Sequence, residues 1–384
     1  MKKDFDIVRV DLGPDSYDIV IGSGALDSLT GFVSGKKYSR SALIITDTNV
    51  GPLYADRVKA LLAAAGITAA VATIPAGEAS KSLTVAEEVY TTAIEAGLDR
   101  HSPVIALGGG VVGDLSGFIA ATYMRGVPFI QIPTSLLADV DSSVGGKVAV
   151  NHRLGKNLIG AFYQPDAVFI DLDCLKTLPA REISTGLGEI VKYGIISDAA
   201  MLDYLEENAE AVKALDTEAV RHLIIRSCEI KADVVSRDEK EGGLRRILNF
   251  GHTMAHAVEK EAGYGCYNHG EAVAIGMVCA AHISAALKLA DEALLGRIEK
   301  LCRQCTGFRT EHFRAGRRFR RRRRRRGSRS RDCRRGRRRS RSGFHTARRG
   351  RIRFPRVRFR SSSRRFWWYH SEICKIRCFQ QFCG

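Results

Sequence analysis

Short apolar runs alternate with helical spacing through the first half of the chain. Four of these runs predict buried strands, at residues 42–47, 70–76, 103–110 and 128–135. Helical patterns follow the first two runs, at residues 54–66 and 84–97, and each pattern ends at a glycine suited to a C-cap. A fifth apolar run closes this half at residues 167–172. The βαβ order predicts an α/β region with a largely parallel sheet.

From about residue 180 the apolar positions follow helical spacing throughout, with breaks near 242–243 and 263–268. The longest apolar run, at 272–290, is interrupted by three polar residues, so it predicts a buried helix and no membrane span. We therefore expect an α/β domain over residues 1–175 and an all-helical domain over residues 176–304. A ligand site is expected where two such domains meet.

The last 80 residues have another composition. Residues 305–384 hold 29 Arg and one Lys against three acidic residues, whereas the whole chain has a net charge of +18. The first 304 residues therefore carry a net charge of −9. The tail contains no Leu, and its phenylalanines follow neither helix nor strand spacing. We expect the tail to share no core with the body and to be disordered.

The remaining composition predicts a cytoplasmic location. The stretch MKKDFDIVRVDLG carries charge but no apolar segment, so it does not fit a secretory signal. The five cysteines before residue 304 are odd in number and without pattern, which is typical of a reducing compartment.

A glycine-rich turn follows the third strand. In GGGVVGD, Gly108, Gly110 and Gly113 match G-x-G-x-x-G between a strand and a helix. This turn is either a tight connection or a site where backbone amides and a helix N-terminus hold a pyrophosphate. The acidic residue that an ordinary dinucleotide site places about 20 positions later is missing. Asp47 and Asn49 end an earlier strand instead, so a nucleotide site here differs from the ordinary Rossmann arrangement.

Three predicted helices offer metal ligands. His252 and His256 lie four residues apart, a pair that alone is more often packing or surface than metal binding. His269 starts the next helix, and Glu189 lies one turn from Lys192 on an earlier helix. One Glu and two His with an open position form a catalytic zinc arrangement, so the three helices together favour a metal site.

Basic residues gather around the same motifs. We expect residues 141–157 to form a Gly-rich loop that carries Asp141, Lys147, Lys156 and Asn157. Further basic residues are Arg125, Lys231 and Arg245. The simplest interpretation is solvated surface charge, which holds best for Lys231 alone. A cleft that collects several of them in an acidic body predicts a small anionic substrate, such as a phosphate or carboxylate.

The long block at 108–165, followed by GLGEIVKYG, LNFGHTMAHAVE and HGEAVAIGM, resembles the 3-dehydroquinate synthase family. The resemblance runs in order from about residue 5 to 304. It implies an N-terminal α/β nucleotide-binding domain, a helical C-terminal domain that binds metal and substrate, and a homodimer. It also implies bound NAD and one divalent metal, zinc or cobalt.

The resemblance also implies roles for individual residues. The metal ligands would be Glu189, His252 and His269. The catalytic groups would be Lys147, Lys192, Lys231, Asn249 and His256, which makes His256 a proton-handling residue and not a metal ligand. Further substrate contacts would be Arg125, Asp141, Asn157 and Arg245. NAD would meet Asp47, Asn49, Glu78, Lys81, Gly110, Val111, Val112, Gly113, Asp114, Thr134, Ser135, Lys147, Lys156, Cys174, Leu175, Lys176 and Thr177. Ser135 stands where the family commonly has Thr, and the hydroxyl is kept.

The implied reaction converts a seven-carbon sugar acid phosphate to 3-dehydroquinate and phosphate through oxidation, elimination, reduction and an intramolecular aldol step. Two other enzyme classes share parts of this design: polyol dehydrogenases, which release NADH, and cyclases that make other carbocycles. The Arg-rich tail raises a third class, a nucleic-acid-binding protein, but the acidic body gives no electrostatic reason for it. We expect the tail to bind polyanions only nonspecifically.

The family continues beyond residue 304 through further helices and a substrate-binding lysine, and this chain has no matching stretch. Our hypothesis is a reading-frame slip near residues 303–308, which sequencing of the source DNA would test. Losing those helices would expose apolar faces, so we expect a chain that folds poorly or has weak activity.

Overall fold

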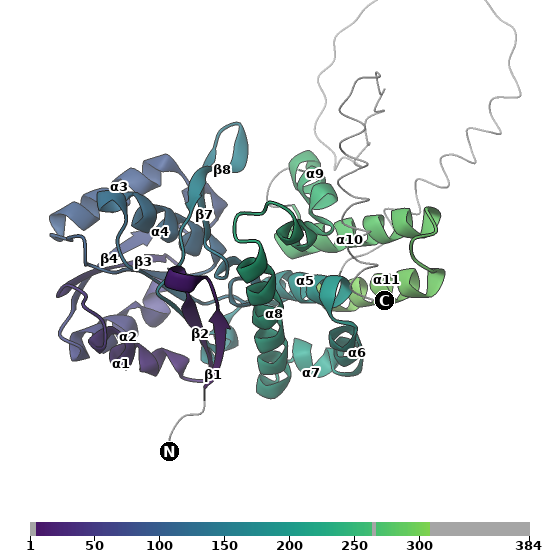
Figure 1. Ribbon diagram of the computed structural model, residues 1–384, viewed down its shortest axis with the longest axis horizontal. Helices are drawn as coiled ribbons and strands as arrows, with labels where there is room; N and C mark the ends of the chain where they lie inside the picture. The colour runs from purple at the N-terminus through teal and green to yellow at the C-terminus, as the bar shows by residue number, and fades with distance from the viewer. Residues whose placement is uncertain (1–4, 263–265, 308–384) are drawn as a thin grey trace, which may run out of the picture.

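The computed structural model describes residues 5–262 and 266–307 (Figure 1). Seven strands form one sheet in the order β1-β2-β9-β6-β5-β3-β4, and every pair is parallel except β1 with β2. The strands are β1 (Asp6–Val10), β2 (Tyr17–Gly22), β3 (Ser41–Asp47), β4 (Thr68–Ile74), β5 (Val104–Gly108), β6 (Phe129–Pro133) and β9 (Ala167–Asp171). The five predicted strands and the largely parallel sheet are confirmed, and the β1–β2 hairpin is an addition.

Helices cover both faces of this sheet. Strand side chains alternate, so Ile44 of β3 packs with α1 (Leu29–Ser34) and α2 (Gly51–Ala64), whereas Ile45 packs with α3 (Leu83–Glu95) and α4 (Gly110–Thr122). Both predicted helices are therefore present as α2 and α3. The glycines after them, Gly66 and Gly97, have positive φ angles of 77° and 67°, as the C-cap prediction requires.

The prediction of a Gly-rich loop at 141–157 is wrong. Most of its second half belongs to an antiparallel hairpin of β7 (Lys147–His152) and β8 (Gly155–Phe162). Glycine content suggested a loop, but Val148 and Val150 are buried against the core beneath α3 and α4, and this burial fixes the strand. The glycines act just before it, where Gly145 and Gly146 take positive φ angles of 93° and 64°.

The second half is helical, as predicted, and lies beside the sheet (Figure 1). Its helices are α5 (Ala180–Ser197), α6 (Ala199–Glu207), α7 (Ala209–Lys213), α8 (Thr217–Arg237), α9 (His252–Ala262), α10 (His269–Ala286) and α11 (Glu292–Thr306). The apolar run at 272–290 forms most of α10, which is buried among α5, α9 and α11. Among the described residues, no helix has both the length and the apolar character needed to cross a membrane.

One hydrophobic cluster joins the sheet edge to the helices. Val10 and Ile19 from β1 and β2 pack in the same cluster as Ile190 of α5 and Val235 of α8. The core is therefore continuous where we predicted a domain boundary, and the division at residue 175 stays a prediction. The predicted tail began at residue 305, but Cys305 and Thr306 belong to the last turn of α11 and are buried, so the prediction is wrong for these residues. The rest of the tail prediction falls on residues 308–384, which lie outside the described residues.

Candidate active site

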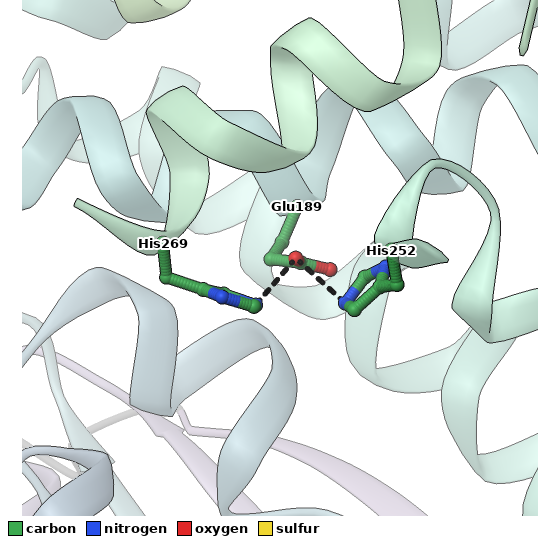
Figure 2. A group of neighbouring side chains, drawn as sticks. All are labelled: Glu189, His252 and His269. Carbon is green, nitrogen blue, oxygen red and sulfur yellow. Dashed lines mark ion pairs between the residues drawn. The ribbon is translucent and has the colours of Figure 1, made fainter. Parts of the chain in front are cut away.

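The three predicted metal ligands come together. Glu189 projects from α5 between His252 and His269, which begin α9 and α10 (Figure 2). The Nε2 atoms of His252 and His269 lie 3.6 and 3.5 Å from the same oxygen, Glu189 Oε1. One ligand atom from each residue lies within 4.8 Å of the other two. Three residues that are far apart in the chain thus present two nitrogens and one oxygen to one point.

Close helix contacts at glycines produce this convergence. Gly270 follows His269, and a Cβ atom at Gly270 would lie 2.3 Å from the Thr185 carbonyl oxygen of α5. Gly251 precedes His252, and a Cβ atom on Gly276 of α10 would lie 1.9 Å from the Gly251 carbonyl oxygen. Only glycine lets these backbones approach so closely. The backbone contacts adjoin the ligands, so they fix the distances among the three side chains.

Burial and neighbouring charges set the protonation of the three ligands. Burial disfavours ionisation of Glu189, but Lys192, His252 and His269 together outweigh it and lower the pKa of that carboxyl to about 2. Burial lowers the pKa of His252 to about 4, so its imidazole is neutral. Burial has the same effect on His269, but Glu189 and Glu259 overcome it and raise its pKa to about 9. A metal bound at His269 would displace the proton from the coordinating nitrogen.

A buried charge network adjoins the ligands. Asp141 Oδ1 accepts from Lys231 Nζ at 2.7 Å and from the Tyr193 hydroxyl at 2.7 Å. Lys192 Nζ lies 3.8 Å from the same oxygen and also pairs with Glu189, so it joins the network to the metal ligands. Burial opposes the charge on Asp141, but Lys231 and Lys192 hold its pKa well below the usual range. Burial in turn lowers the pKa of Lys231.

A second polar group lies where the turn before β7 meets the segment between α8 and α9. Lys147 Nζ donates to Glu241 Oε2 at 2.6 Å, and Asn249 Nδ2 donates to the other oxygen of that carboxylate. Arg245 is 1% exposed and donates to the Gly145 carbonyl at 2.7 Å. The structure thus gathers Lys147, Arg245 and Asn249, which come from both halves of the chain.

Most of the predicted nucleotide residues follow the carboxyl ends of parallel strands, whereas Lys147 and Lys156 lie in the antiparallel β7–β8 hairpin. Because the parallel strands run the same way, the residues that follow them share one edge of the sheet, at the switch point between β3 and β5 where ligands bind in such folds. They are Asp47 and Asn49 after β3, Glu78 and Lys81 after β4, Gly110 to Asp114 after β5, Thr134 and Ser135 after β6, and Cys174 to Thr177 after β9. Lys81 pairs with Asp114 and donates to Asn157 Oδ1 at 2.6 Å, which brings the hairpin to this edge.

Two predicted residues stand apart. Arg125 follows the far end of α4, at the opposite edge of the sheet, where its side chain is exposed. Arg125 and Met124 both have positive φ angles, of 70° and 47°. His256 is exposed one turn after His252, and its ring centroid lies 5.8 Å from that of His252 and 6.5 Å from that of His269.

Sequence reasoning missed two acidic residues. Glu241 accepts hydrogen bonds from Lys147 and Asn249. Nothing in the sequence around Glu241 indicates this role. Glu259 is 7% exposed on α9 and lies 3.8 Å from His269 Nδ1 and 3.9 Å from Lys156 Nζ. A signal for Glu259 was present, because it lies seven residues after His252 and therefore on the same helix face.

The chain is similar in sequence to one family of known proteins. Family models match the chain as 3-dehydroquinate synthase N-terminal over residues 71–185 and 3-dehydroquinate synthase C-terminal over residues 186–315. A 3-dehydroquinate synthase of Desulforamulus reducens is 56% identical over 277 residues, which are 72% of this chain and 77% of that protein.

Two solved structures are similar as well. A 2-epi-5-epi-valiolone synthase from Streptomyces hygroscopicus, with NAD⁺ and Zn²⁺ bound, has a TM-score of 0.70 at 32% identity and covers 75% of this chain and 80% of its own. A 2-deoxy-scyllo-inosose synthase complexed with carbaglucose-6-phosphate, NAD⁺ and Co²⁺ has a TM-score of 0.71 at 27% identity and covers 79% of this chain and 81% of its own.

Proposed function

The chain belongs to the 3-dehydroquinate synthase family, and we propose that its site converts 3-deoxy-D-arabino-heptulosonate 7-phosphate to 3-dehydroquinate and inorganic phosphate. This is a lyase reaction of the shikimate pathway. The observation that carries the proposal is the convergence of Glu189, His252 and His269 beside a buried network of lysines. Two further proposals stand beside it: the resemblance supports a homodimer, and the composition supports a cytoplasmic location.

The ligand residues fit a divalent metal. Glu189 Oε1 is buried without a hydrogen-bond donor, yet two imidazole nitrogens lie within 3.6 Å of it. Such an orphaned carboxylate oxygen costs free energy unless a cation neutralises it. Two nitrogens and one oxygen with an open position suit Zn²⁺, and Co²⁺ accepts the same donors. The metal, when bound, would act as a Lewis acid on a substrate oxygen.

The sheet edge fits a dinucleotide. A Cβ atom at Gly110 would lie 2.9 Å from Ser142 Oγ, so glycine keeps the N-terminus of α4 open to a pyrophosphate. Asp47 Oδ1 accepts from the backbone amides of Asn49 and Val50 at 2.8 and 3.0 Å, which fixes the turn after β3. NAD, when bound, would supply reversible hydride exchange at the C5 alcohol of the substrate.

The basic residues would bind the anionic ends of the substrate. Lys192 and Lys231 are 1% and 6% exposed, so their charges are little screened by water and act strongly on a phosphate or carboxylate. Lys147, Asn249 and Arg245 would complete this set, with Asp141 and Asn157 as further substrate contacts. Arg125 lies at the opposite edge of the sheet and does not join this set within one chain. Holding both ends of one substrate supplies the orientation that an elimination and an aldol step both need.

Proton handling falls to side chains near the ligands. Oxidation of C5 acidifies the neighbouring C–H bond, and loss of that proton expels phosphate. His256, beside His252 on α9, would move protons in these steps, and Lys192 and Lys231 would stabilise the developing negative charge. After the carbonyl is reduced again, the enol product opens and closes to 3-dehydroquinate.

The stoichiometry of phosphate and NADH tests the proposal. Protein incubated with the heptulosonate phosphate and a trace of NAD⁺ should release phosphate and 3-dehydroquinate in equal amounts, without net NADH. NADH formed in proportion to product would support a polyol dehydrogenase instead. A different carbocycle formed from another sugar phosphate would identify another cyclase of the superfamily.

A further inference from the structure

We propose that Glu259 is a positioning residue, which orients the metal ligand His269 and links it to the nucleotide edge of the sheet. The inference rests on the metal and nucleotide sites proposed above. Glu259 lies on α9, is 7% exposed, and places Oε1 3.8 Å from His269 Nδ1.

The two nitrogens of His269 face different carboxylates. Nε2 lies 3.5 Å from Glu189 Oε1 at the ligand cluster, whereas Nδ1 faces Glu259. With a metal on Nε2, the Nδ1–H group would point at Glu259. A carboxylate in this position selects the imidazole tautomer, fixes the ring and makes the coordinating nitrogen more basic. Glu259 therefore sits where it can strengthen metal binding without touching the metal.

The same carboxylate also faces the other half of the molecule. Lys156 Nζ of β8 lies 3.9 Å from Glu259 Oε1 and 3.9 Å from Glu78 Oε1, which follows β4 at the nucleotide edge. A line of alternating charges thus runs from Glu78 through Lys156 and Glu259 to His269. A nucleotide that draws Lys156 toward its phosphates would change the charge felt by Glu259, and so the orientation of His269. We infer that NAD affinity and metal affinity are coupled through this pair.

A purely structural role predicts something else. If Glu259 only neutralised Lys156 at the contact between the halves, its loss would lower stability and leave metal affinity unchanged. The two roles therefore separate in a metal titration, provided that the variants fold. Thermal unfolding of each metal-free protein reports the structural part.

The first experiment measures Co²⁺ affinity of the full chain by competition with a chelator, followed by the visible absorption of the bound ion. Glu259→Gln should weaken Co²⁺ binding about 10–100-fold, and Glu259→Asp, which keeps the charge, should weaken it less. The matched control is Glu261→Gln, which removes the same charge from an exposed position on the same helix and should leave affinity unchanged. If the Gln variant does not fold, the Asp variant should still bind Co²⁺ more weakly than the wild type.

The outcomes distinguish failure of the positioning role of Glu259 from failure of the proposed metal site. If the wild type binds Co²⁺, Glu189→Gln does not, and both Glu259 variants bind like the wild type, the positioning role is wrong and the metal site stands. If the wild type binds no Co²⁺, or Glu189→Gln binds it equally well, the metal site and this inference both fail.

The second experiment measures the Kd of NAD⁺ with and without Co²⁺. The wild type should show different values, and the ratio should move toward one in Glu259→Gln and in Lys156→Met. The double variant should add nothing to either single change, because both remove the same link. A wild-type ratio of one, or a ratio that survives both substitutions, would overturn the coupling.

Discussion

Asp141 shows how single residues keep charge buried beside the ligands. One oxygen of its carboxylate accepts hydrogen bonds from Lys231 and Tyr193. Lys192 forms ion pairs with both Asp141 and Glu189. Buried ions of this kind are stable only while each has its partner. The network therefore keeps two lysines charged and in place where an anionic substrate would bind.

Lys231→Met tests this network. The variant should lower the free energy of unfolding by about 1–3 kcal/mol, because Asp141 loses a buried donor. It should also lower kcat/KM at least about 100-fold, a loss that corresponds to about 2.7 kcal/mol of transition-state stabilisation. Urea unfolding and steady-state kinetics measure the two effects, and Lys231→Arg, which keeps the charge, should recover much of the stability. Unchanged kinetics in the Met variant would remove Lys231 from the site.

For individual residues, the sequence predicted the proposed metal ligands better than the acidic residues that contact the surrounding side chains. Glu189, His252 and His269 stand in long motifs, and their convergence needed only three helices to meet. Glu241 and Glu259 act through partners 94 and 103 residues away in the chain, Lys147 and Lys156. No local pattern encodes such pairs, because they depend on how the hairpin lies against α9 and the segment before it.

Among the elements, the contact between α5 and α10 decides the shape of the site. Gly188 and Gly270 face each other there, and a Cβ atom at Gly188 would lie 2.9 Å from the Gly270 Cα. Their neighbours in the sequence, Glu189 and His269, are both proposed ligands. Any wider spacing of the two helices would therefore separate those two side chains.

Gly270→Ala should disrupt the site through this contact. The new methyl group would meet the Thr185 carbonyl at 2.3 Å, so α10 has to move and the free energy of unfolding should fall by about 1–3 kcal/mol. Metal binding should weaken as well. Gly296→Ala on α11 is the control, since nothing lies within 4 Å of the added atom, and it should be neutral or stabilise by up to about 1 kcal/mol. Equal melting temperatures and metal affinities for the two variants would contradict the account.

Asp238 orders the turn between α8 and α9. Its carboxylate accepts from the backbone amides of Gly242, Gly243 and Arg245 at 2.7–2.8 Å. These bonds, that of Arg245 foremost, lower the pKa of Asp238, so the stabilisation is complete above its ordinary pKa of about 3.9. It is lost as the pH falls through the lower folded-state pKa.

Asp238→Asn should therefore destabilise the protein more at pH 7 than near pH 3. The measurement is the urea midpoint of both proteins across this range, where the two curves should approach each other as the pH falls. The neighbouring Asp233→Asn serves as a comparison on an exposed helix face. A difference that grows toward low pH would have the wrong sign for this explanation.

The elements themselves were largely predictable. Apolar runs in a βαβ order predicted five strands of the parallel sheet, and helical spacing predicted the second half. The β7–β8 hairpin was not predicted, because its glycines and polar residues hide the strand pattern that Val148 and Val150 form. β1 and β2 are as long as the predicted strands β5, β6 and β9, but Asp6, Arg9 and Asp18 interrupt their apolar runs.

In the whole molecule, charge divides sharply between the body and the tail. The first 304 residues carry a net charge of −9 and the remaining 80 carry the entire excess of positive charge. Full-length protein should bind heparin and single-stranded RNA without sequence preference, and salt should release it steeply. A chain ending at Gly307 should bind neither. Retained, sequence-dependent RNA binding by the shorter chain would instead favour a nucleic-acid function.

The central claim is that a divalent metal at Glu189, His252 and His269 serves a cyclase reaction. The most direct measurement is phosphate release from the heptulosonate phosphate by metal-stripped protein during titration with Zn²⁺ at saturating NAD⁺. We expect no release without metal, a release rate that rises with Zn²⁺ and levels off at one equivalent per chain, and no recovery in Glu189→Ala. Undiminished release from the stripped protein, or full recovery in the Glu189→Ala variant, would contradict it.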